Sequence, residues 1–272
     1  IETSMYFKDF LDKNSKTLIM GILNITPDSF YDGNKYFDSD LSKKFNQLDK
    51  CDIIDIGAES SRPGAKSINE DDEISRISKT FKFLINSSKF YSIDTWKPNV
   101  ASYCIKNGFN MINDITGGQN KDMFDVASNY KVPIILMHMQ GNPTNMQNKP
   151  KYNNIIDDLK FFFEKRINLA IKHGINPKNI IIDPGIGFGK TVSQNDEIIN
   201  NISKFKDFGL PILIGLSRKS FLTYKSNKPK DRLESSLAVS VIAINNGADI
   251  IRVHDIKKSI EVFSIIDRVL NN

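Results

Sequence analysis

The amino-acid sequence predicts a (β/α)8 barrel, and three observations lead to that fold class. Eight short apolar segments recur along the 272-residue chain. Longer amphipathic segments separate them, as the helices of successive βαβ units do. The chain is also close to the length of roughly 250 residues that is typical of such a barrel. A doubly wound open sheet has the same alternation of strands and helices, so the alternation alone does not establish that the sheet closes.

The eight predicted strands are apolar throughout rather than alternating, which is typical of parallel strands that are buried on both faces. They are rich in β-branched residues. In chain order they read TLIMGIL, DIIDIG, YSID, MIND, VPIILMH, NIIIDP, PILIGLS and DIIRVH, and they end at residues 23, 57, 94, 114, 138, 184, 217 and 254.

Three of the intervening segments show the 3.6-residue spacing of apolar positions that is typical of helices. They cover residues 70–85, 154–174 and 231–247, and the last two end in glycine. Glycine commonly ends a helix because it enters the left-handed conformation without strain. We therefore expect helices over these three ranges, within one barrel domain that spans residues 1–272.

Composition and charge limit the classes of partner. The chain is 40% hydrophobic and 25% charged, and its net charge of +5 is spread along the sequence rather than gathered in a block. This spread argues against nucleic acid and membrane surfaces as partners, whereas a basic balance suits small anionic substrates. Cys51 and Cys104 form neither a disulfide framework nor a metal-ligand pattern, so we expect a cytoplasmic protein. We see no targeting segment and no apolar run long enough to span a membrane.

The segment DPGIGFGKT, residues 183–191, looks at first like a phosphate-binding loop. The P-loop pattern requires a glycine five positions before Gly189, where Pro184 has no N–H to offer. The dinucleotide pattern requires a third glycine at the position of Lys190. Neither nucleotide motif is therefore present.

Polar side chains follow the carboxyl ends of the predicted strands, and in a barrel these ends share one mouth. The acceptors and amides are Asp94, Asn113 and Asp183, and the cationic or proton-carrying groups are Arg62, Lys219, Arg252 and His254. A single Asp or Asn after a strand more often caps the next helix or starts a turn than binds a ligand. Together they predict a substrate with a hydrogen-bonding heterocycle at one end and a phosphate at the other.

The sequence also contains a series of motifs in a fixed order, over about residues 18–256. They are MGILNITPDSFYDG, ESSRPGA, SIDTWKP, NDITGG, LMHMQGNPTNMQ, DPGIGFGKT, GLSRKSF and RVHD. Together they resemble the dihydropteroate synthase family. The resemblance implies a transferase of folate biosynthesis that joins 6-hydroxymethyl-7,8-dihydropterin pyrophosphate to p-aminobenzoate. It further implies Mg²⁺ as a cofactor and a homodimer.

The resemblance implies a set of roles for individual residues. The pterin-binding residues are Asp94, Asn113, Asp183, Lys219 and Phe188. The pyrophosphate-binding residues are Asn24, Arg252 and His254, with Asn24 also a metal ligand. The p-aminobenzoate pocket comprises Phe30, Ser61, Arg62, Pro63, Phe188 and Ser220, the last at a helix N-terminus. Asp32, Arg62 and Lys219 are the catalytic residues, and Asp32 stabilises a cationic pterin in a dissociative substitution.

In this interpretation the glycines between Asp183 and Lys190 let the backbone turn under a flat ring, and Phe188 faces the aromatic second substrate. A plain barrel turn is the alternative. The sequence departs from the usual family pattern at Ala58, Ser61, Tyr31 and Asn34. We expect these departures to affect how the loops close over the substrate and how tightly drugs bind.

Two other functions are compatible with parts of the pattern. A pterin-binding methyltransferase on the same barrel shares the pterin acids but does not need SRPG, SRKS and RVHD, which this chain has. A non-catalytic pterin-binding relative, acting as a regulator or scaffold, is favoured only by the altered first loop. Turnover of purified substrates separates the three.

Overall fold

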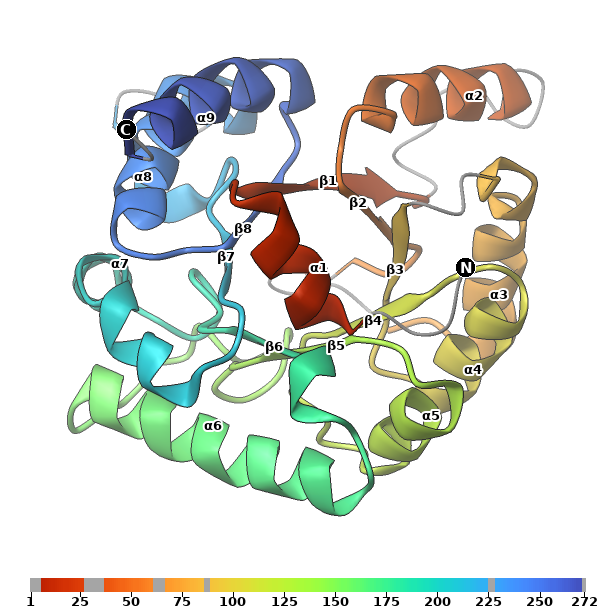
Figure 1. The fold of residues 1–272 in the computed structure, drawn as a ribbon, viewed down its shortest axis with the longest axis horizontal. Coiled ribbons are helices and arrows are strands. Elements are labelled where there is room, and N and C mark those ends of the chain that lie inside the picture. The colour runs from red at the N-terminus through yellow and green to blue at the C-terminus, as the bar shows by residue number, and fades with distance from the viewer. Residues whose placement is uncertain (1–5, 27–36, 61–66, 86–88, 225–227, 271–272) are drawn as a thin grey trace.

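The structure is a computed structural model that describes residues 6–26, 37–60, 67–85, 89–224 and 228–270. Eight parallel strands form one sheet in the order β6-β5-β4-β3-β2-β1-β8-β7. The two ends of this sheet meet in a parallel bridge between Ile182 and Ile212. There the N–H of Ile182 donates to the carbonyl of Pro211 at 3.0 Å. The sheet therefore curls round into a (β/α)8 barrel, as predicted, rather than an open doubly wound sheet (Figure 1).

All eight predicted strands are present, and their ends lie within two residues of the predicted ones. They are β1 (Leu18–Asn24), β2 (Ile53–Gly57), β3 (Phe90–Asp94), β4 (Met111–Asp114), β5 (Ile134–Met137), β6 (Ile180–Asp183), β7 (Leu213–Gly215) and β8 (Ile250–Val253).

The helices surround the sheet. They are α1 (Phe7–Asn14), α2 (Phe37–Leu48), α3 (Glu70–Ser78), α4 (Pro98–Lys106), α5 (Asp122–Tyr130), α6 (Ile155–Lys172), α7 (Val192–Asn200), α8 (Leu233–Asn245) and α9 (Ile256–Leu270). The predicted helices at 154–174 and 231–247 are confirmed as α6 and α8. The helix predicted at 70–85 is shorter, because α3 ends at Ser78 and a 3-10 turn follows at Phe81–Phe83. The hydroxyl of Thr80 donates to the carbonyl of Ile77 at 2.7 Å, a local bond that competes with continuation of the helix.

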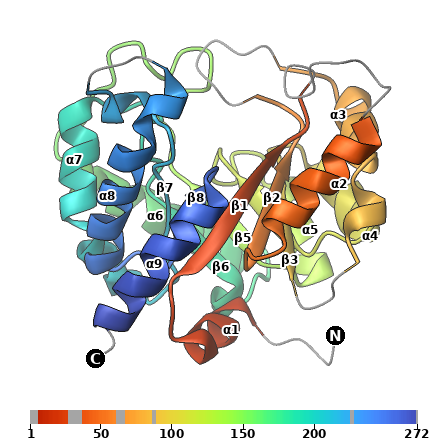
Figure 2. The same ribbon diagram turned by 90° about the horizontal axis from the view of Figure 1, so that it is seen from above.

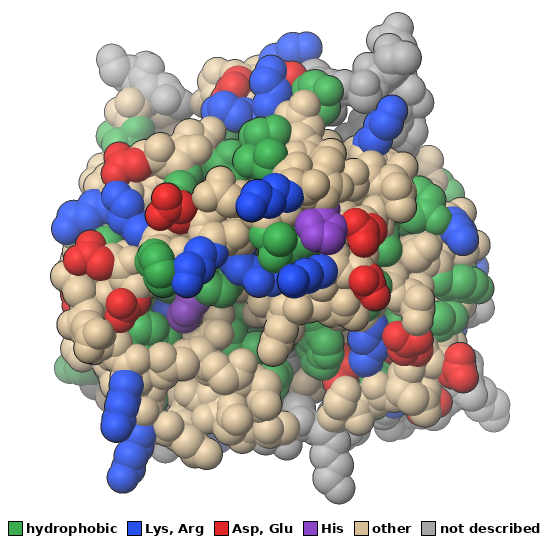
Figure 3. All heavy atoms as spheres, turned by 90° about the horizontal axis from the view of Figure 1, so that it is seen from below, with side chains coloured by type: hydrophobic (Ala, Val, Ile, Leu, Met, Phe, Trp, Pro, Cys, Tyr) green, Lys and Arg blue, Asp and Glu red, His purple; other side chains and the backbone are tan. Residues whose placement is uncertain are grey.

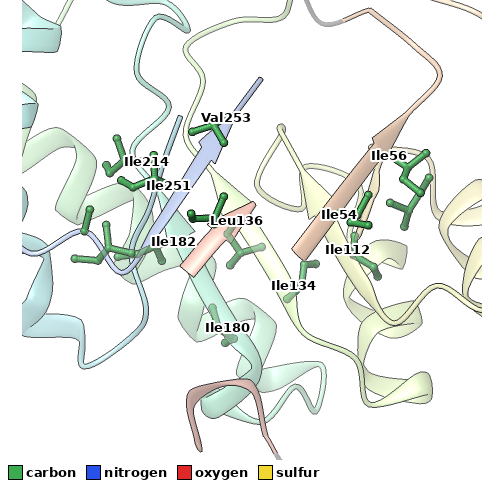
Figure 4. Close-up of a cluster of buried hydrophobic side chains, with 14 of the residues drawn as sticks. Ile54, Ile56, Ile112, Ile134, Leu136, Ile180, Ile182, Ile214, Ile251 and Val253 are labelled. Atoms are coloured by element: carbon green, nitrogen blue, oxygen red, sulfur yellow. The ribbon is translucent and has the colours of Figure 1, made fainter. Parts of the chain in front are cut away.

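The hydrophobic core has two layers, one on each face of the barrel wall. The outer layer lies between strands and helices and includes Ile54, Ile134 and Ile251 (Figure 4). The inner layer includes Met20 and Ile135 and continues into α1. Helix α1, which the sequence patterns did not predict, covers the amino end of the barrel, opposite the loops that follow the strands (Figures 1 and 2).

The inward-facing residues change from apolar to polar along the strands. Successive inward residues are two positions apart, since strand side chains alternate between the faces. The inner core contains Ile53, Met111, Ile181 and Ile250, and two positions beyond them stand Asp55, Asn113, Asp183 and Arg252. The barrel therefore has an apolar floor near α1 and a polar layer towards its mouth.

The outer face along α6, at the lower edge of Figure 1, carries a mixture of basic, acidic and hydrophobic side chains (Figure 3). Both cysteines, Cys51 and Cys104, are buried and free, and burial raises the pKa of each thiol above its ordinary value. Among the helices that the structure describes, none has the length and apolar character needed to cross a membrane.

Candidate active site

A pocket opens at the carboxyl ends of the strands. Its apolar lining includes Ile22, Ile115, Met137 and Phe188. Its charged and hydrogen-bonding lining includes Asp94, Asn113, Asp183, Ser217, Lys219, Arg252 and His254. A concave, largely apolar site with a few convergent polar groups is the usual form of a small-molecule site.

The structure thus brings together most of the described residues that the sequence analysis placed in a site. Asp94, Asn113 and Asp183 come from the ends of three different strands and line one pocket with Lys219. His254, just beyond β8, lines it as well, and its ring Nδ1 lies 3.1 Å from the hydroxyl of Ser217. The predicted ring-binding and anion-binding groups therefore face a common space.

Arg252 occupies the centre of an ionic network in this pocket. Its Nε donates to Asp55 Oδ2 at 2.7 Å, and its Nη2 donates to Asp94 Oδ2 at 2.8 Å. Asn113 donates to the same oxygen of Asp55 at 3.0 Å. Although burial lowers the pKa of the Arg252 guanidinium, the two carboxylates outweigh it and raise that pKa overall.

The acids of the pocket are harder to ionise than usual. Burial, aided by the nearby charge of Asp55, raises the pKa of Asp94 to about 7, although Arg252 opposes the shift. Burial also raises the pKa of Asp183, against the attraction of Lys219. Conversely, burial lowers the pKa of the Lys219 ammonium to about 8, against the attraction of Asp183. Such mutually perturbed groups in a cleft are typical of functional sites.

Asp183 and Lys219 both form hydrogen bonds with the backbone of the glycine-rich loop between β6 and α7. The Oδ1 of Asp183 accepts the N–H of Gly185 at 2.7 Å. Lys219 donates to the carbonyl of Ile186, and its Nζ lies 4.4 Å from the centre of the Phe188 ring. Gly185, with φ of 69°, adopts a left-handed conformation that favours glycine. The loop is a tight turn, and Phe188 on it lines the pocket.

Asp55 is the charged residue that the sequence analysis missed. It stands in the middle of β2, is wholly buried, and joins Arg252 to Asn113. A signal was present, because a carboxylate within a strand that is buried on both faces needs a partner. Arg218, in the loop after β7, donates through Nε to Asp255 at 2.9 Å and so links the loops after β7 and β8.

Two predicted site residues, Asn24 and Ser220, are not among those that line the pocket. Asn24 ends β1, in register with Gly57, two positions beyond the pocket residue Ile22. Ser220 begins a 3-10 helix of three residues, Ser220–Leu222, rather than an α-helix. That turn offers fewer aligned N–H groups than the helix N-terminus that the sequence suggested.

The first two loops of the predicted site lie outside the described residues. Phe30 and Asp32, with the variant positions Tyr31 and Asn34, belong to the first, and Ser61, Arg62 and Pro63 belong to the second. Ala58, which precedes the second loop, is buried in the outer core.

The fold agrees with comparisons to known proteins. Residues 20–254 match the family described as pterin binding enzyme. A dihydropteroate synthase of Clostridium beijerinckii is 42% identical over 262 residues, which cover 94% of this chain and 95% of the relative. The chain therefore belongs to the pterin binding enzyme family and, within it, to the dihydropteroate synthases.

Solved structures give the same result. The dihydropteroate synthase of Xanthomonas albilineans with 4-aminobenzoic acid has a TM-score of 0.88 and 31% identity, covering 96% of this chain and 95% of that one. The Yersinia pestis dihydropteroate synthase in a sulfonamide drug complex has a TM-score of 0.88 and 37% identity, covering 95% of this chain and 96% of that one.

Proposed function

We propose that this chain joins 6-hydroxymethyl-7,8-dihydropterin pyrophosphate to p-aminobenzoate and releases pyrophosphate and 7,8-dihydropteroate. One observation carries the proposal: buried carboxylates and an amide meet cationic side chains in a single pocket at the barrel mouth. A pterin needs acceptors for its N–H groups, and its pyrophosphate needs donors, so the pocket suits both ends of this substrate.

The ring end is assigned to Asp94, Asn113 and Asp183, with Lys219 and Phe188 beside them. Asp183 already accepts one backbone N–H at its Oδ1. Its other oxygen therefore remains suited to a ring donor. A charge-assisted pair formed away from water both fixes the orientation of the ring and strengthens its binding. Phe188 supplies an aromatic face to the same pocket.

The anion end is assigned to Arg252 and His254, together with Asn24. Arg252 in β8 and His254 just beyond it both line the pocket. In the free protein Arg252 is held by Asp55 and Asp94. A ring that donates its own N–H groups to Asp94 competes with Arg252 there and leaves Nη2 available to a phosphate oxygen.

The reaction is a substitution in which the bond from the pterin methylene carbon to the pyrophosphate oxygen breaks before the new bond forms. The cation that results is stabilised by Asp32, in a role implied by the family resemblance. The amine nitrogen of p-aminobenzoate then attacks the methylene carbon and loses a proton. We assign the aminobenzoate to Phe30, Ser61, Arg62, Pro63, Phe188 and Ser220, and retain Arg62 and Lys219 as catalytic residues.

We also propose that Mg²⁺ is the cofactor, with the side-chain oxygen of Asn24 as its protein ligand. In the part of the chain that the structure describes, no group of three or more His, Cys, Asp or Glu side chains surrounds a metal position. A single amide oxygen fits Mg²⁺ nonetheless, because this ion usually keeps several waters and takes its other ligands from substrate phosphates. When bound, it neutralises charge on the departing pyrophosphate.

A cytoplasmic homodimer, each subunit a single pterin-binding domain over residues 1–272, completes the proposal. Its support is the family resemblance, the two free thiols and the composition of α8. Eight of the 13 residues of helix α8 are apolar, and the side chain of Ile242 is 45% exposed. An apolar helix normally lies buried, so a second copy of the chain is the partner we assign to it.

Turnover of purified substrates tests the function. We expect 7,8-dihydropteroate to form from the pterin pyrophosphate and p-aminobenzoate when Mg²⁺ is present, and not after chelation. The pterin alcohol, which lacks the leaving group, is the matched control and should give no product. Absence of product at saturating substrates and Mg²⁺ would contradict the proposal and favour a non-catalytic pterin-binding protein. Transfer of a methyl group would favour the methyltransferase.

A further inference from the structure

Hydrogen bonds from side chains hold the backbone of the glycine-rich loop between β6 and α7. Each of its backbone carbonyls from residue 185 to residue 189 accepts a hydrogen bond from a side chain. The acceptor and donor pairs are Gly185 with Lys190 (2.9 Å), Ile186 with Lys219, Gly187 with Gln147 (2.8 Å), Phe188 with Lys190 (3.0 Å) and Gly189 with Tyr152 (2.8 Å). Only Lys219 and Phe188 in this arrangement line the pocket.

Lys190 binds the loop from its buried side. Its side chain is almost wholly buried, and its ammonium also lies 3.1 Å from the ring Nδ1 of His138. His138 remains neutral, because burial and the charge of Lys190 lower its pKa to about 2. The neutral ring can therefore accept a hydrogen bond from the Nζ of Lys190.

Gln147 binds the loop from its solvent side. It lies in the long segment after β5, which is held in shape by two bonds between Gln140 and the backbone of Lys151, each 2.8 Å. From this segment the amide of Gln147 reaches across to Gly187, and the hydroxyl of Tyr152 reaches Gly189. The loops after β5 and β6 are thus joined by side-chain bonds.

These bonds restrict a loop that would otherwise have wide conformational freedom. Gly185 and Gly187 both have positive φ. Glycine adopts positive and negative φ with similar energy, so these residues do not by themselves hold the loop in one conformation. Between them and Gly189 stands Phe188, the aromatic side chain that the loop presents to the pocket. The position of Phe188 therefore depends in part on three donors that do not line the pocket, Gln147, Tyr152 and Lys190.

We propose that Gln147 and Lys190 are positioning residues of the reaction, which hold Phe188 and the Asp183 end of the loop in the substrate-binding geometry. This inference rests on the proposed function for the identity of the substrates. It assigns Gln147 and Lys190 no contact with substrate. Their effect is transmitted through the backbone of residues 185–189.

Gln147 gives the sharper test because its side chain is exposed and its replacement leaves no cavity. Gln147→Met keeps the length and removes the donor. We expect the KM for p-aminobenzoate to rise about two- to tenfold, the equivalent of one net hydrogen bond. The melting temperature should stay within about 2 °C of the wild-type value, because surface substitutions usually change stability little. Gln147→Lys, whose long side chain can still donate to Gly187, should restore the KM.

Lys190→Met is the second variant, and Lys160→Met is its matched control. Lys160 forms a surface ion pair with Asp207 on the outside of the barrel, remote in sequence from the loop. We expect Lys190→Met to raise the KM values of both substrates more than Gln147→Met does, and Lys160→Met to leave them unchanged. If Lys190→Met does not fold, the Gln147 pair alone decides the proposal.

Hydrogen exchange separates failure of this proposal from failure of the proposed function. The peptide that spans residues 184–191 should exchange faster in Gln147→Met than in the wild type, whether or not the enzyme turns over. Unchanged exchange and an unchanged KM in an active enzyme would overturn the positioning role and leave the function intact. A fall in melting temperature that accompanies the loss of activity, with no rescue by Gln147→Lys, would also overturn it.

Discussion

Arg252 and Asp55 form an ion pair inside the barrel, with 2.7 Å between Nε and Oδ2. The side chain of Asp55 is wholly buried and that of Arg252 is 22% exposed, so water screens this pair only weakly. Asp94 binds the other end of the guanidinium at 2.8 Å. Two carboxylates therefore hold Arg252 in place in the free protein. The same side chain is the one assigned to the pyrophosphate, so it has both a structural and an anion-binding role.

Arg252→Lys should weaken binding of the pterin pyrophosphate and lower turnover. Lysine keeps the charge but cannot reproduce the planar fork that addresses Asp55, Asp94 and a phosphate from fixed directions. One lost charge-assisted bond predicts a weakening of about ten- to a hundredfold, measured by calorimetry. The free pterin alcohol is the control ligand, and its affinity should change little. Equal losses for both ligands would remove Arg252 from the anion site and leave it only the bracing role.

Asp55→Asn should destabilise the protein, because it removes the wholly buried one of the two carboxylates that pair with the Arg252 guanidinium. Breaking a buried ion pair by removing one partner costs about 3–5 kcal/mol in free energy of unfolding. Asn keeps an oxygen that can still accept a hydrogen bond from Arg252, so we expect a loss at or below the lower end of this range. Denaturant unfolding measures the change. The control is Asp207→Asn on the exposed pair with Lys160, where the expected loss is below about 1 kcal/mol. Similar losses at the two positions would show that Asp55 does not stabilise Arg252.

Asp183→Ala should weaken pterin binding by about ten- to a hundredfold or more. The substitution removes a charge-assisted pair worth roughly 1.5–3 kcal/mol and leaves ring donors unpaired in a buried site. It also removes the acceptor for the N–H of Gly185, so the melting temperature must be measured beside the affinity. Unchanged pterin affinity in a folded variant would show that the assignment of this acid is wrong.

The value of kcat/KM for the pterin pyrophosphate should pass through a maximum between two pKa values. Asp94 accepts ring N–H groups as a carboxylate, so activity should rise as the pH increases through its raised pKa of about 7. Lys219 loses its charge as the pH increases through its lowered pKa of about 8, so activity should fall there. Lys219→Arg should move the alkaline limb to higher pH, because the guanidinium stays charged. A profile that is flat from pH 6 to 9 would contradict both assignments.

Sulfonamides should inhibit this enzyme by competing with p-aminobenzoate. The Yersinia pestis relative was solved in a sulfonamide drug complex, and this chain keeps Pro63 and Phe188, with Ser61 at the position where the family most often has threonine. Raising p-aminobenzoate at fixed inhibitor should restore the rate. Ser61→Thr is the matched variant that tests whether this departure alters drug affinity. Inhibition that does not respond to p-aminobenzoate would place the drug elsewhere.

Several features of this protein follow from the sequence alone. The short runs of β-branched residues predict strands because parallel strands that are covered on both faces are apolar throughout, and because the runs are too short for buried helices. The alternation of strands with amphipathic segments then predicts parallel order and a shared mouth, which brought Asp94, Asn113 and Asp183 into one candidate site. The family motifs indicated which substrates to expect, and hydrophobic patterns carry no information of that kind.

The tertiary structure decided what depends on contacts between residues distant in sequence. Whether the sheet closes is settled at Ile182 and Ile212, and α1 covers the barrel floor through contacts that local patterns do not specify. The pairing of Arg252 with Asp55 spans 197 positions, and Gln147 meets Gly187 across 40. The sequence determines local periodicity and the chemistry of single side chains, whereas the partner of a buried charge is determined only when the strands take their neighbours around the barrel.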